Sequence, residues 1–372
     1  MRSDNEAMGC FLLAVLGCYS TSAFSSQGTA DPSSVVSKPL PSPAESSSAP
    51  APVADTATTP ATSSASASTT AASPSAQQML ERMTQAAQDL SYEMSFIRVN
   101  KSSIDAMRYR HARVNNLDLS QMLQLDGPRR EVLQRGGEIS YFEPGVEPFT
   151  IRSSHIVDSM PSVLHADFQL LSQYYDFVPV GRARVVDRPA QVVRIVPRDD
   201  FRYSYVVWLD EESKLLLRAD LLDRDGETLE QYRVISYLIA PELSKAMAKL
   251  NEVALPPVIT FEPQTKLDMS WSPSWLPGGF AEISRSRHRL PNVDVPVESK
   301  LYSDGLFSFT VYVSPAEGRN IREQLVRQGR RTVQAEQQGQ YEVTVVGELP
   351  PATAKRIAHG VKFAGSSAPT AQ

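Results

Sequence analysis

The five histidines of the sequence offer no arrangement suited to metal binding or to nucleophilic catalysis. No H-x-x-x-H or H-E-x-x-H spacing relates any two of them, and two lie beside arginines, which repel a metal cation. They are His111, His155, His165, His288 and His359. The motifs G-x-S-x-G, Walker A and G-x-G-x-x-G do not occur in the sequence either. We therefore predict a protein that is not an enzyme and has no catalytic residues, metal site or cofactor.

Two groups of arginines have the spacing of one strand face and could bind anions. Arg285, Arg287 and Arg289 form one group, and Arg108 and Arg110 form the other. Guanidinium groups bind phosphates and carboxylates through paired hydrogen bonds. Several of them on one face repel one another, so an anion or an acidic partner should face them. The alternative for each group is solvation, or pairing with nearby Asp and Glu.

The first arginine group lies between two turn signals. Pro277-Gly278 suits a type II turn, with Pro at the first central position and Gly at the second. Asp304-Gly305 suits a type I′ hairpin turn, which would set Tyr302 opposite Phe307. The stretch Trp271–Val313 is therefore predicted to form the centre of a small β-rich domain.

Three motifs of this stretch resemble the C-terminal domain of the RseB/MucB family, the periplasmic regulators of the sigma-E (AlgU) envelope-stress pathway. They are W-L-P-x-G-F at Trp275–Phe280, R-x-R-H at Arg285–His288, and L-Y-S-D-G-L-F-S at Leu301–Ser308. The resemblance extends over roughly residues 77–363, and the three motifs together are more specific than any one of them.

The resemblance implies a regulatory binding protein. Such a protein holds the periplasmic part of an RseA/MucA-like transmembrane anti-sigma factor, protects it from proteolysis, and releases it when lipopolysaccharide or mislocalised lipoprotein binds. The residues expected to contact the partner are Arg285, Arg287, His288, Arg289 and Tyr302. Those expected to bind lipid are Arg108, Arg110, Tyr203, Tyr205 and Trp208. The alternative function is a periplasmic lipid or lipoprotein carrier, and a homo-oligomer is left open.

Charge and cysteine content narrow the function classes further. The chain has 37 basic and 42 acidic residues, for a net charge of -5 and a pI near 5.7, so we expect no nucleic-acid partner. Its two cysteines, Cys10 and Cys18, lie in the first twenty residues. Disulfides and Cys-based zinc sites are therefore excluded from the folded part.

The first 75 residues are predicted to contain an export signal followed by a disordered tether. Met8–Cys18 resembles the apolar region of a signal peptide and is too short to span a bilayer, so residues 1–24 are predicted to be a signal peptide. Lipidation at Cys18 is the alternative, because Val15–Cys18 resembles a lipobox. Residues 25–75 are nearly all Ser, Ala, Thr and Pro and are predicted to be a disordered tether. We expect the mature protein in the periplasm.

Residues 76–245 are predicted to form the first folded domain. An amphipathic helix over 76–90 precedes many consecutive hairpins, which indicate a large antiparallel sheet that must curl or be covered. The family resemblance implies an α+β fold here, similar to the lipoprotein carriers LolA and LolB: a half-barrel with helices and an apolar cavity. Tyr203 and Tyr205 would lie on one sheet face and Trp208 on the other; which face lines a cavity is left open.

A linker at 246–258 and a smaller α+β domain at 259–364 follow, with a disordered tail at 365–372. Beyond the motif stretch we predict a helix near 316–328 and two strands at 331–336 and 340–349. A last helix should begin at Pro350-Pro351 and end near Gly360, because Pro fits the first helical turn and Gly the end.

Overall fold

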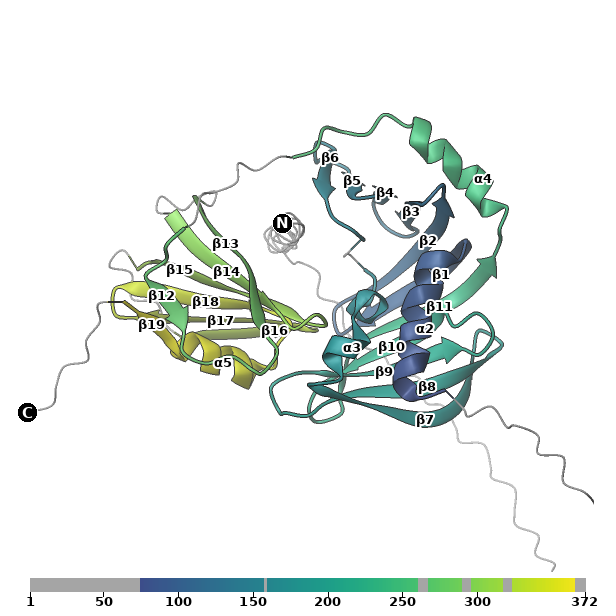
Figure 1. The fold of residues 1–372 in the computed structure, drawn as a ribbon. Coiled ribbons are helices and arrows are strands. Elements are labelled where there is room, and N and C mark those ends of the chain that lie inside the picture. Colours follow the sequence, from purple (N-terminus) through teal and green to yellow (C-terminus); the bar gives the residue numbers. More distant parts are fainter. Residues whose placement is uncertain (1–73, 157–158, 260–266, 290–295, 317–322, 365–372) are drawn as a thin grey trace, which may run out of the picture. The chain divides into compact units, whose positions relative to one another are not determined.

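The computed structural model describes residues 74–156, 159–259, 267–289, 296–316 and 323–364. The first domain contains an eleven-stranded antiparallel sheet in the order β6-β5-β4-β3-β2-β1-β11-β10-β9-β8-β7 (Figure 1). Its strands are β1 Tyr92–Asn100, β2 Ile104–Val114, β3 Leu117–Gln124, β4 Glu131–Arg135, β5 Glu138–Phe142, β6 Phe149–Arg152, β7 Tyr175–Val185, β8 Arg188–Pro197, β9 Ser204–Asp210, β10 Leu216–Leu222 and β11 Thr228–Ile239. Strand β1 pairs with β11, which joins the run β1–β6 and the run β7–β11 into one sheet.

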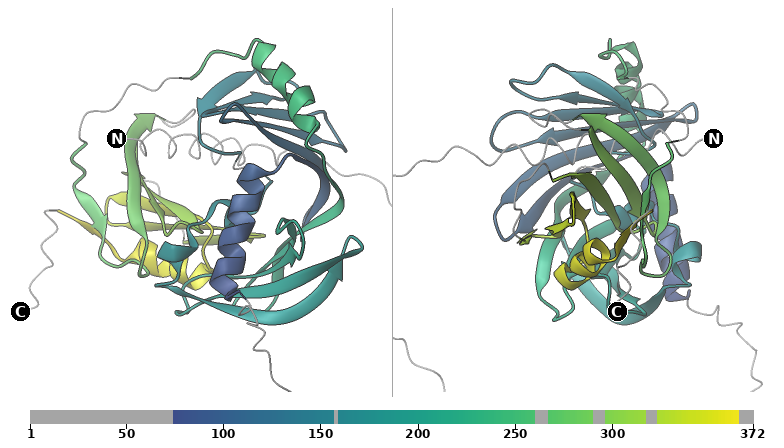
Figure 2. Two further views of the ribbon diagram at one scale, coloured as in Figure 1. Left: turned by 45° about the vertical axis from the view of Figure 1, so that its right-hand side comes forward. Right: turned by 90° about the vertical axis from the view of Figure 1, so that its left-hand side faces the viewer.

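The sheet curves around helix α2, Ala76–Asp89, and the short helix α3, Phe168–Leu171 (Figure 2). Ser75 begins α2 with a capping box, in which its hydroxyl accepts from the Gln78 backbone N–H and the Gln78 side chain accepts from the Ser75 N–H. Leu80 and Met83 of α2 are fully buried against the concave side of the sheet. The predicted first helix and the predicted large antiparallel sheet of consecutive hairpins are confirmed.

Strands β6 and β7 lie in segments for which the sequence pattern predicted no strand. Strand β7 is an edge strand, pairing with β8 alone, and it carries Pro179 and Gly181 at a bulge. Proline is tolerated at a sheet edge, where its missing N–H costs no ladder hydrogen bond. Local breaker residues therefore hid a strand that its neighbour β8 stabilises.

The segment after β11 leads along the first domain. Helix α4, Leu243–Met247, and the 3₁₀ helix η2, Ala248–Glu252, precede a stretch that lies beside β6. There the Thr150 hydroxyl donates to the Pro256 carbonyl at 2.8 Å, and the Ile259 N–H donates to the Thr150 carbonyl at 2.8 Å. The segment thereby covers the β6 edge of the sheet.

The second domain contains a six-stranded antiparallel sheet in the order β13-β14-β15-β18-β17-β16. Helix α5, Pro351–His359, packs against β17 and β18, and its start and its Gly360 cap confirm the predicted last helix. The strands are β13 Ala281–Arg289, β14 Pro296–Ser303, β15 Ser308–Pro315, β16 Gln324–Gln328, β17 Arg331–Gln338 and β18 Tyr341–Gly347, while β12 Trp271–Pro273 pairs with β19 Val361–Phe363.

Three local predictions for this domain are wrong. Residues 324–328 form strand β16 instead of a helix, because pairing with β17 decides their conformation; residues 317–322 lie outside the described residues. Tyr302 pairs with Phe309, not Phe307, because four residues rather than two connect β14 to β15. The turn at Pro277 is displaced by one residue, so that Gly279 takes the positive φ of +87° and Phe280 N–H donates to the Pro277 carbonyl.

A bulge at Ile283 changes which residues share a face of β13. Glu282 pairs with Tyr302 and Ser284 with Leu301, so Ile283 is the extra residue. Glu282, instead of Ala281 or Ile283, therefore lies on the face of Arg285 and Arg287. The predicted common face of the arginines is retained, but an acidic residue now stands next to it.

Candidate functional site

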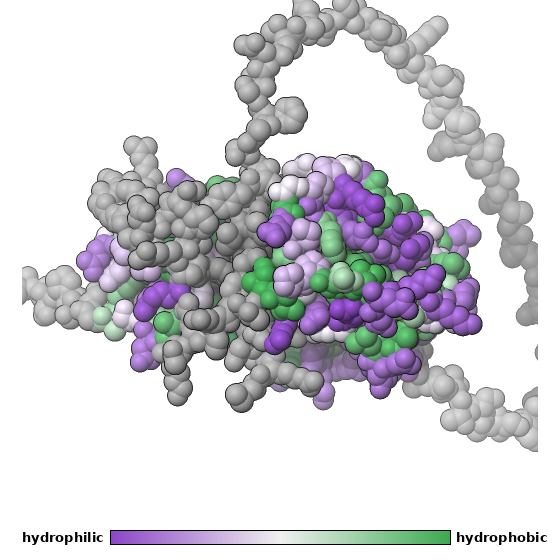
Figure 3. Space-filling view, turned by 90° about the horizontal axis from the view of Figure 1, so that it is seen from above, coloured by the Kyte–Doolittle hydropathy of each residue, from purple (hydrophilic) through white to green (hydrophobic). Residues whose placement is uncertain are grey.

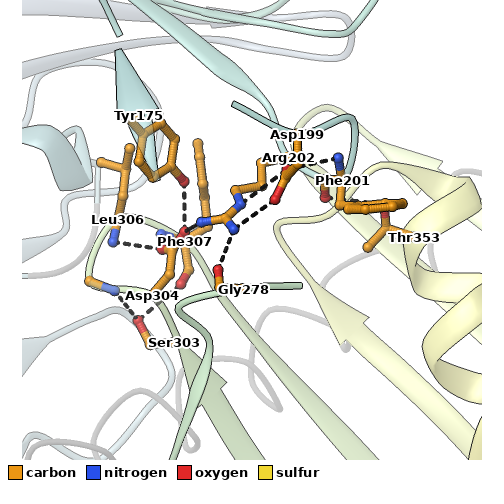
Figure 4. Close-up of polar contacts among 11 residues, drawn as sticks. Tyr175, Asp199, Phe201, Arg202, Gly278, Ser303, Asp304, Leu306, Phe307 and Thr353 are labelled. Atoms are coloured by element: carbon orange, nitrogen blue, oxygen red, sulfur yellow. Dashed lines mark hydrogen bonds and ion pairs between the residues drawn. The ribbon is translucent and has the colours of Figure 1, made fainter. Parts of the chain in front are cut away.

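The joint between the two domains is organised around one buried arginine. Arg202, in the loop between β8 and β9, is 2% exposed. Its guanidinium donates to the Asp304 carboxylate at 2.9 Å, to the Asp199 carboxylate at 2.8 Å and to the Gly278 carbonyl (Figure 4). Asp304 and Gly278 belong to the second domain, so this single side chain connects both of its turns to the first domain.

Asp304 is enclosed completely, with no exposed side-chain surface. One of its oxygens accepts from Arg202 and from the Tyr175 hydroxyl, the latter at 2.6 Å. The other oxygen accepts from the backbone N–H groups of Leu306 and Phe307, at 2.9 and 2.8 Å. Burial and the Asp304 carboxylate raise the pKa of Tyr175 well above its ordinary value, so the phenol remains a donor.

Aromatic rings surround the guanidinium. Tyr174, Tyr175 and Phe280 have ring centroids 5.2–5.4 Å from the central carbon of Arg202. Gly279 is required beside them for two reasons: its φ is positive, and a Cβ there would stand 2.7 Å from the Tyr174 ring. The buried charge therefore has both hydrogen-bond partners and ring faces on all sides.

Further contacts extend the joint beyond the ion pair. Tyr205 stacks on Phe307 with a centroid separation of 5.8 Å and an interplanar angle of 2°. The Tyr203 hydroxyl donates to the Leu349 carbonyl at 2.7 Å, and the Thr353 hydroxyl donates to the Phe201 carbonyl at 3.1 Å. Arg356 lies 3.7 Å above the Trp275 ring, which meets Phe201 edge-on.

The rim of the joint is charged. Arg327 of β16 pairs with Asp223 and, at 3.5 Å, with Glu227. Arg330, in the turn after β16, pairs with Glu230 at 3.6 Å and with Glu348 at 3.2 Å. Because these side chains are partly exposed, salt should weaken them more than the central pair.

The predicted partner-binding arginines of β13 already have acidic neighbours. Arg285 donates to Glu282 at 2.6 Å, and Arg287 donates to Glu298. Lys300, on the adjacent strand, lies 3.8 Å from Glu282. The acidic counterpart that the arginine spacing required is therefore supplied by this domain itself, although both guanidinium groups remain about two-fifths exposed, at 43% and 42%.

The other predicted partner contacts are placed differently. Tyr302 is 3% exposed and stacks on Phe309 at 5.2 Å, so its side chain belongs to the core of the second domain. His288 and Arg289 are residues of β13 whose side chains lie outside the described residues.

The five predicted lipid-binding residues do not lie together. Tyr203 and Tyr205 are buried in the core and at the joint. Trp208 lies on the opposite sheet face, beneath the Arg218 guanidinium at 4.3 Å. Arg108 and Arg110 share that outer face, and Arg110 pairs with Glu93. Tyr203 and Tyr205 therefore lie inside the protein, whereas Trp208, Arg108 and Arg110 lie on the outer face of the sheet.

The surface and metal properties of the described residues add little to this site. On the side shown in Figure 3, hydrophobic and hydrophilic residues are interspersed over the described part of the surface. Within the described residues, no group of three or more His, Cys, Asp and Glu side chains could hold a metal ion. No described helix has the length and apolarity needed to cross a membrane.

Comparison with known proteins identifies the family. The family model of the MucB/RseB N-terminal domain matches residues 75–258, and that of the MucB/RseB C-terminal domain matches residues 265–362. The chain belongs to the MucB/RseB family. It is 54% identical over 291 residues to the sigma-E factor regulatory protein RseB of Escherichia coli K12, covering 78% of this chain and 91% of that protein. The corresponding protein of Haemophilus influenzae is 44% identical over 290 residues, with the same coverages.

Solved structures of the MucB/RseB family resemble this one. A crystal structure of MucB in complex with MucA(peri) has a TM-score of 0.62 at 27% identity, covering 78% of this chain and 100% of that one. A Pseudomonas aeruginosa MucA/MucB complex has a TM-score of 0.64 at 27% identity, covering 78% and 99%. A crystal structure of MucB has a TM-score of 0.51 at 26% identity, covering 77% and 98%.

Two of the three sequence motifs of the MucB/RseB resemblance meet at the joint. The first contributes Trp275, Gly278 and Phe280, and the last contributes Asp304 and Phe307. Their partners Arg202, Asp199 and Tyr175 were missed by sequence reasoning. No local pattern marks these residues, because their roles depend on chain segments about a hundred residues away.

Proposed function

We propose that the protein is a negative regulator of a sigma-E-type envelope stress response. It binds the periplasmic part of an RseA/MucA-like anti-sigma factor and protects it from proteolysis. The observation that carries this proposal is the 54% identity to a sigma-E factor regulatory protein, which spans both domains. The likeness to MucB bound to MucA(peri) supports a two-domain binding protein.

Action by binding alone, without enzyme activity, is supported by the chemistry of the joint. The buried cluster of Arg202, Asp304 and Tyr175 has its hydrogen bonds satisfied within the protein. None of these groups is free to act on a substrate. The same proposal includes a first domain at 76–245, a linker at 246–258 and a second domain at 259–364. It also includes a periplasmic location, with a lipid anchor at Cys18 as the alternative.

Release by lipopolysaccharide or mislocalised lipoprotein is the second part of the proposal. A curved sheet with an apolar concave side supports acyl-chain binding, each buried methylene contributing about 0.8 kcal/mol. The alternative function, a lipid or lipoprotein carrier, would rest on this first domain alone. The extensive joint favours a function that uses both domains.

Titration calorimetry tests the regulator directly. The full chain should bind a synthetic peptide covering the periplasmic part of the anti-sigma factor from the same organism, and a scrambled peptide of equal charge should not bind. Bound peptide should resist cleavage by the site-1 protease. Equal binding of both peptides, or of neither, would contradict the proposal, and acylated lipopolysaccharide that fails to compete would remove the sensing part.

A further inference from the structure

The joint between the domains has a charged centre, and this makes docking nearly all-or-none. Arg202 and Asp304 are both removed from water, with 1% and 0% of their side chains exposed. The desolvation of such a pair largely offsets its Coulomb attraction, so its net contribution to docking is small. Removing one partner while the other stays buried costs several kcal/mol. Partly separated arrangements are therefore the least stable.

Fully separated domains would leave each charge with solvation or local partners. Arg202 retains Asp199, which is 27% exposed and on the same domain. Asp304 retains the N–H groups of Leu306 and Phe307 from its own loop. Two well-satisfied arrangements, docked and undocked, are what a two-state element requires.

The described part of the segment between the domains is attached to the first domain. The segment after η2 is bound to the first domain as far as Ile259, whose N–H donates to the Thr150 carbonyl at 2.8 Å. Arg135 also donates to the carbonyls of Asn251 and Val253, at 3.3 and 3.2 Å. Rotation of the second domain would thus leave this segment in place.

The solved relatives differ from one another in their similarity to this chain. The two structures of MucB with MucA have TM-scores of 0.62 and 0.64, whereas the structure of MucB has a TM-score of 0.51. Sequence identity is 27%, 27% and 26%, and coverage of this chain is 78%, 78% and 77%. This chain therefore superposes better on the two MucA-bound structures than on the structure of MucB.

We propose that the joint switches between a docked arrangement, in which the two domains are in contact, and an undocked arrangement, in which they are apart. We call this two-state joint a latch. The anti-sigma partner binds the docked arrangement in preference to the undocked one. This inference rests on the proposed function, since it says how the binding of that partner is regulated. By linkage, the partner raises the docked population by the same factor by which docking raises partner affinity. Any ligand that favours the undocked arrangement releases the partner without competing for its contact residues.

Inter-domain distance measurements test the latch. The full chain would carry Cys10→Ser and Cys18→Ser, with spin labels at Ser236→Cys and Ser272→Cys, which are exposed and lie in different domains. The parent should show one narrow distance distribution. Asp304→Asn should broaden it and weaken partner-peptide binding about 5- to 150-fold. Saturating peptide should restore the parent distance.

Two further variants keep the test decisive. Arg188→Met breaks the pair with the buried Asp210 inside the first domain; it should change neither the distance nor the affinity. Arg327→Glu sets like charges against Asp223 and Glu227 at the rim and should act as Asp304→Asn does, more weakly. Arg327→Glu takes the place of Asp304→Asn in the test if Asp304→Asn does not fold.

The outcomes separate the latch from the proposed function. An unchanged distance in both joint variants overturns the latch, as does a changed distance with unchanged peptide affinity. A parent that shows the docked distance but binds no anti-sigma peptide overturns the proposed function instead.

Discussion

Replacing Arg202 with methionine removes the cationic side chain that pairs with Asp304 across the joint. The carboxylate would keep Tyr175 and two backbone donors, but its charge would be buried without a cation. Breaking a buried pair from one side commonly costs about 3–5 kcal/mol. We expect the lower end of this range, near about 3 kcal/mol, because the retained hydrogen bonds stabilise the carboxylate.

A double-mutant cycle separates the pair from the surrounding packing. Asp304→Asn alone should cost less, about 1–3 kcal/mol, since Arg202 loses one buried anion but keeps Asp199. The double variant Arg202→Met with Asp304→Asn leaves neither charge unpaired, so its cost should fall short of the sum by about 1–3 kcal/mol.

Urea unfolding monitored by tryptophan fluorescence measures these costs, because Trp208 reports the first domain and Trp271 and Trp275 report the second. Arg188→Met with Asp304→Asn is the control and should be additive, because Asp210 and Asp304 share no partner. Additivity within about 0.5 kcal/mol for the joint pair would refute the reasoning.

Three further predictions concern other sites. Arg285→Gln with Arg287→Gln should reduce stability by no more than about 1 kcal/mol per pair, since both ion pairs are exposed, and calorimetry that shows unchanged partner affinity would remove them from the partner site. Gly279→Ala should lower the melting temperature more than Gly305→Ala, because both have positive φ but only the first would press a Cβ into Tyr174; equal shifts would contradict this. Burial lowers the pKa of His111 below its ordinary value, so the unfolded state binds more protons and stability should fall as pH falls below about 6.5. His111→Asn, followed by urea unfolding at pH 7 and 5, should reduce that fall; an unchanged pH dependence would contradict the assignment.

Local signals in the sequence determined most of the regular structure. Helical periodicity predicted α2, and Pro350-Pro351 with Gly360 predicted the two ends of α5, because these signals lie within a turn or two of the helix that they specify. The sequence pattern also predicted the consecutive hairpins of the large sheet. The combination of three motifs was enough to indicate the family.

The joint was decided by tertiary structure alone. Asp304-Gly305 satisfies the local preference for a two-residue hairpin turn, but the Asp304 carboxylate instead binds Leu306 and Phe307 N–H in a longer loop. Arg202, 102 positions away in sequence, completes that arrangement. A turn preference of this kind is weak compared with the free energy of satisfying a buried charge.

The same reason explains the other departures from expectation. Pairing with β17 overrode the expected helix at Gln324–Gln328, and a bulge at Ile283 brought Glu282 beside Arg285. The sequence alone indicated that the clustered arginines of β13 need an anion or an acidic partner. Which carboxylate supplies it depends on strand register, and register is set by packing between segments that are distant in the chain.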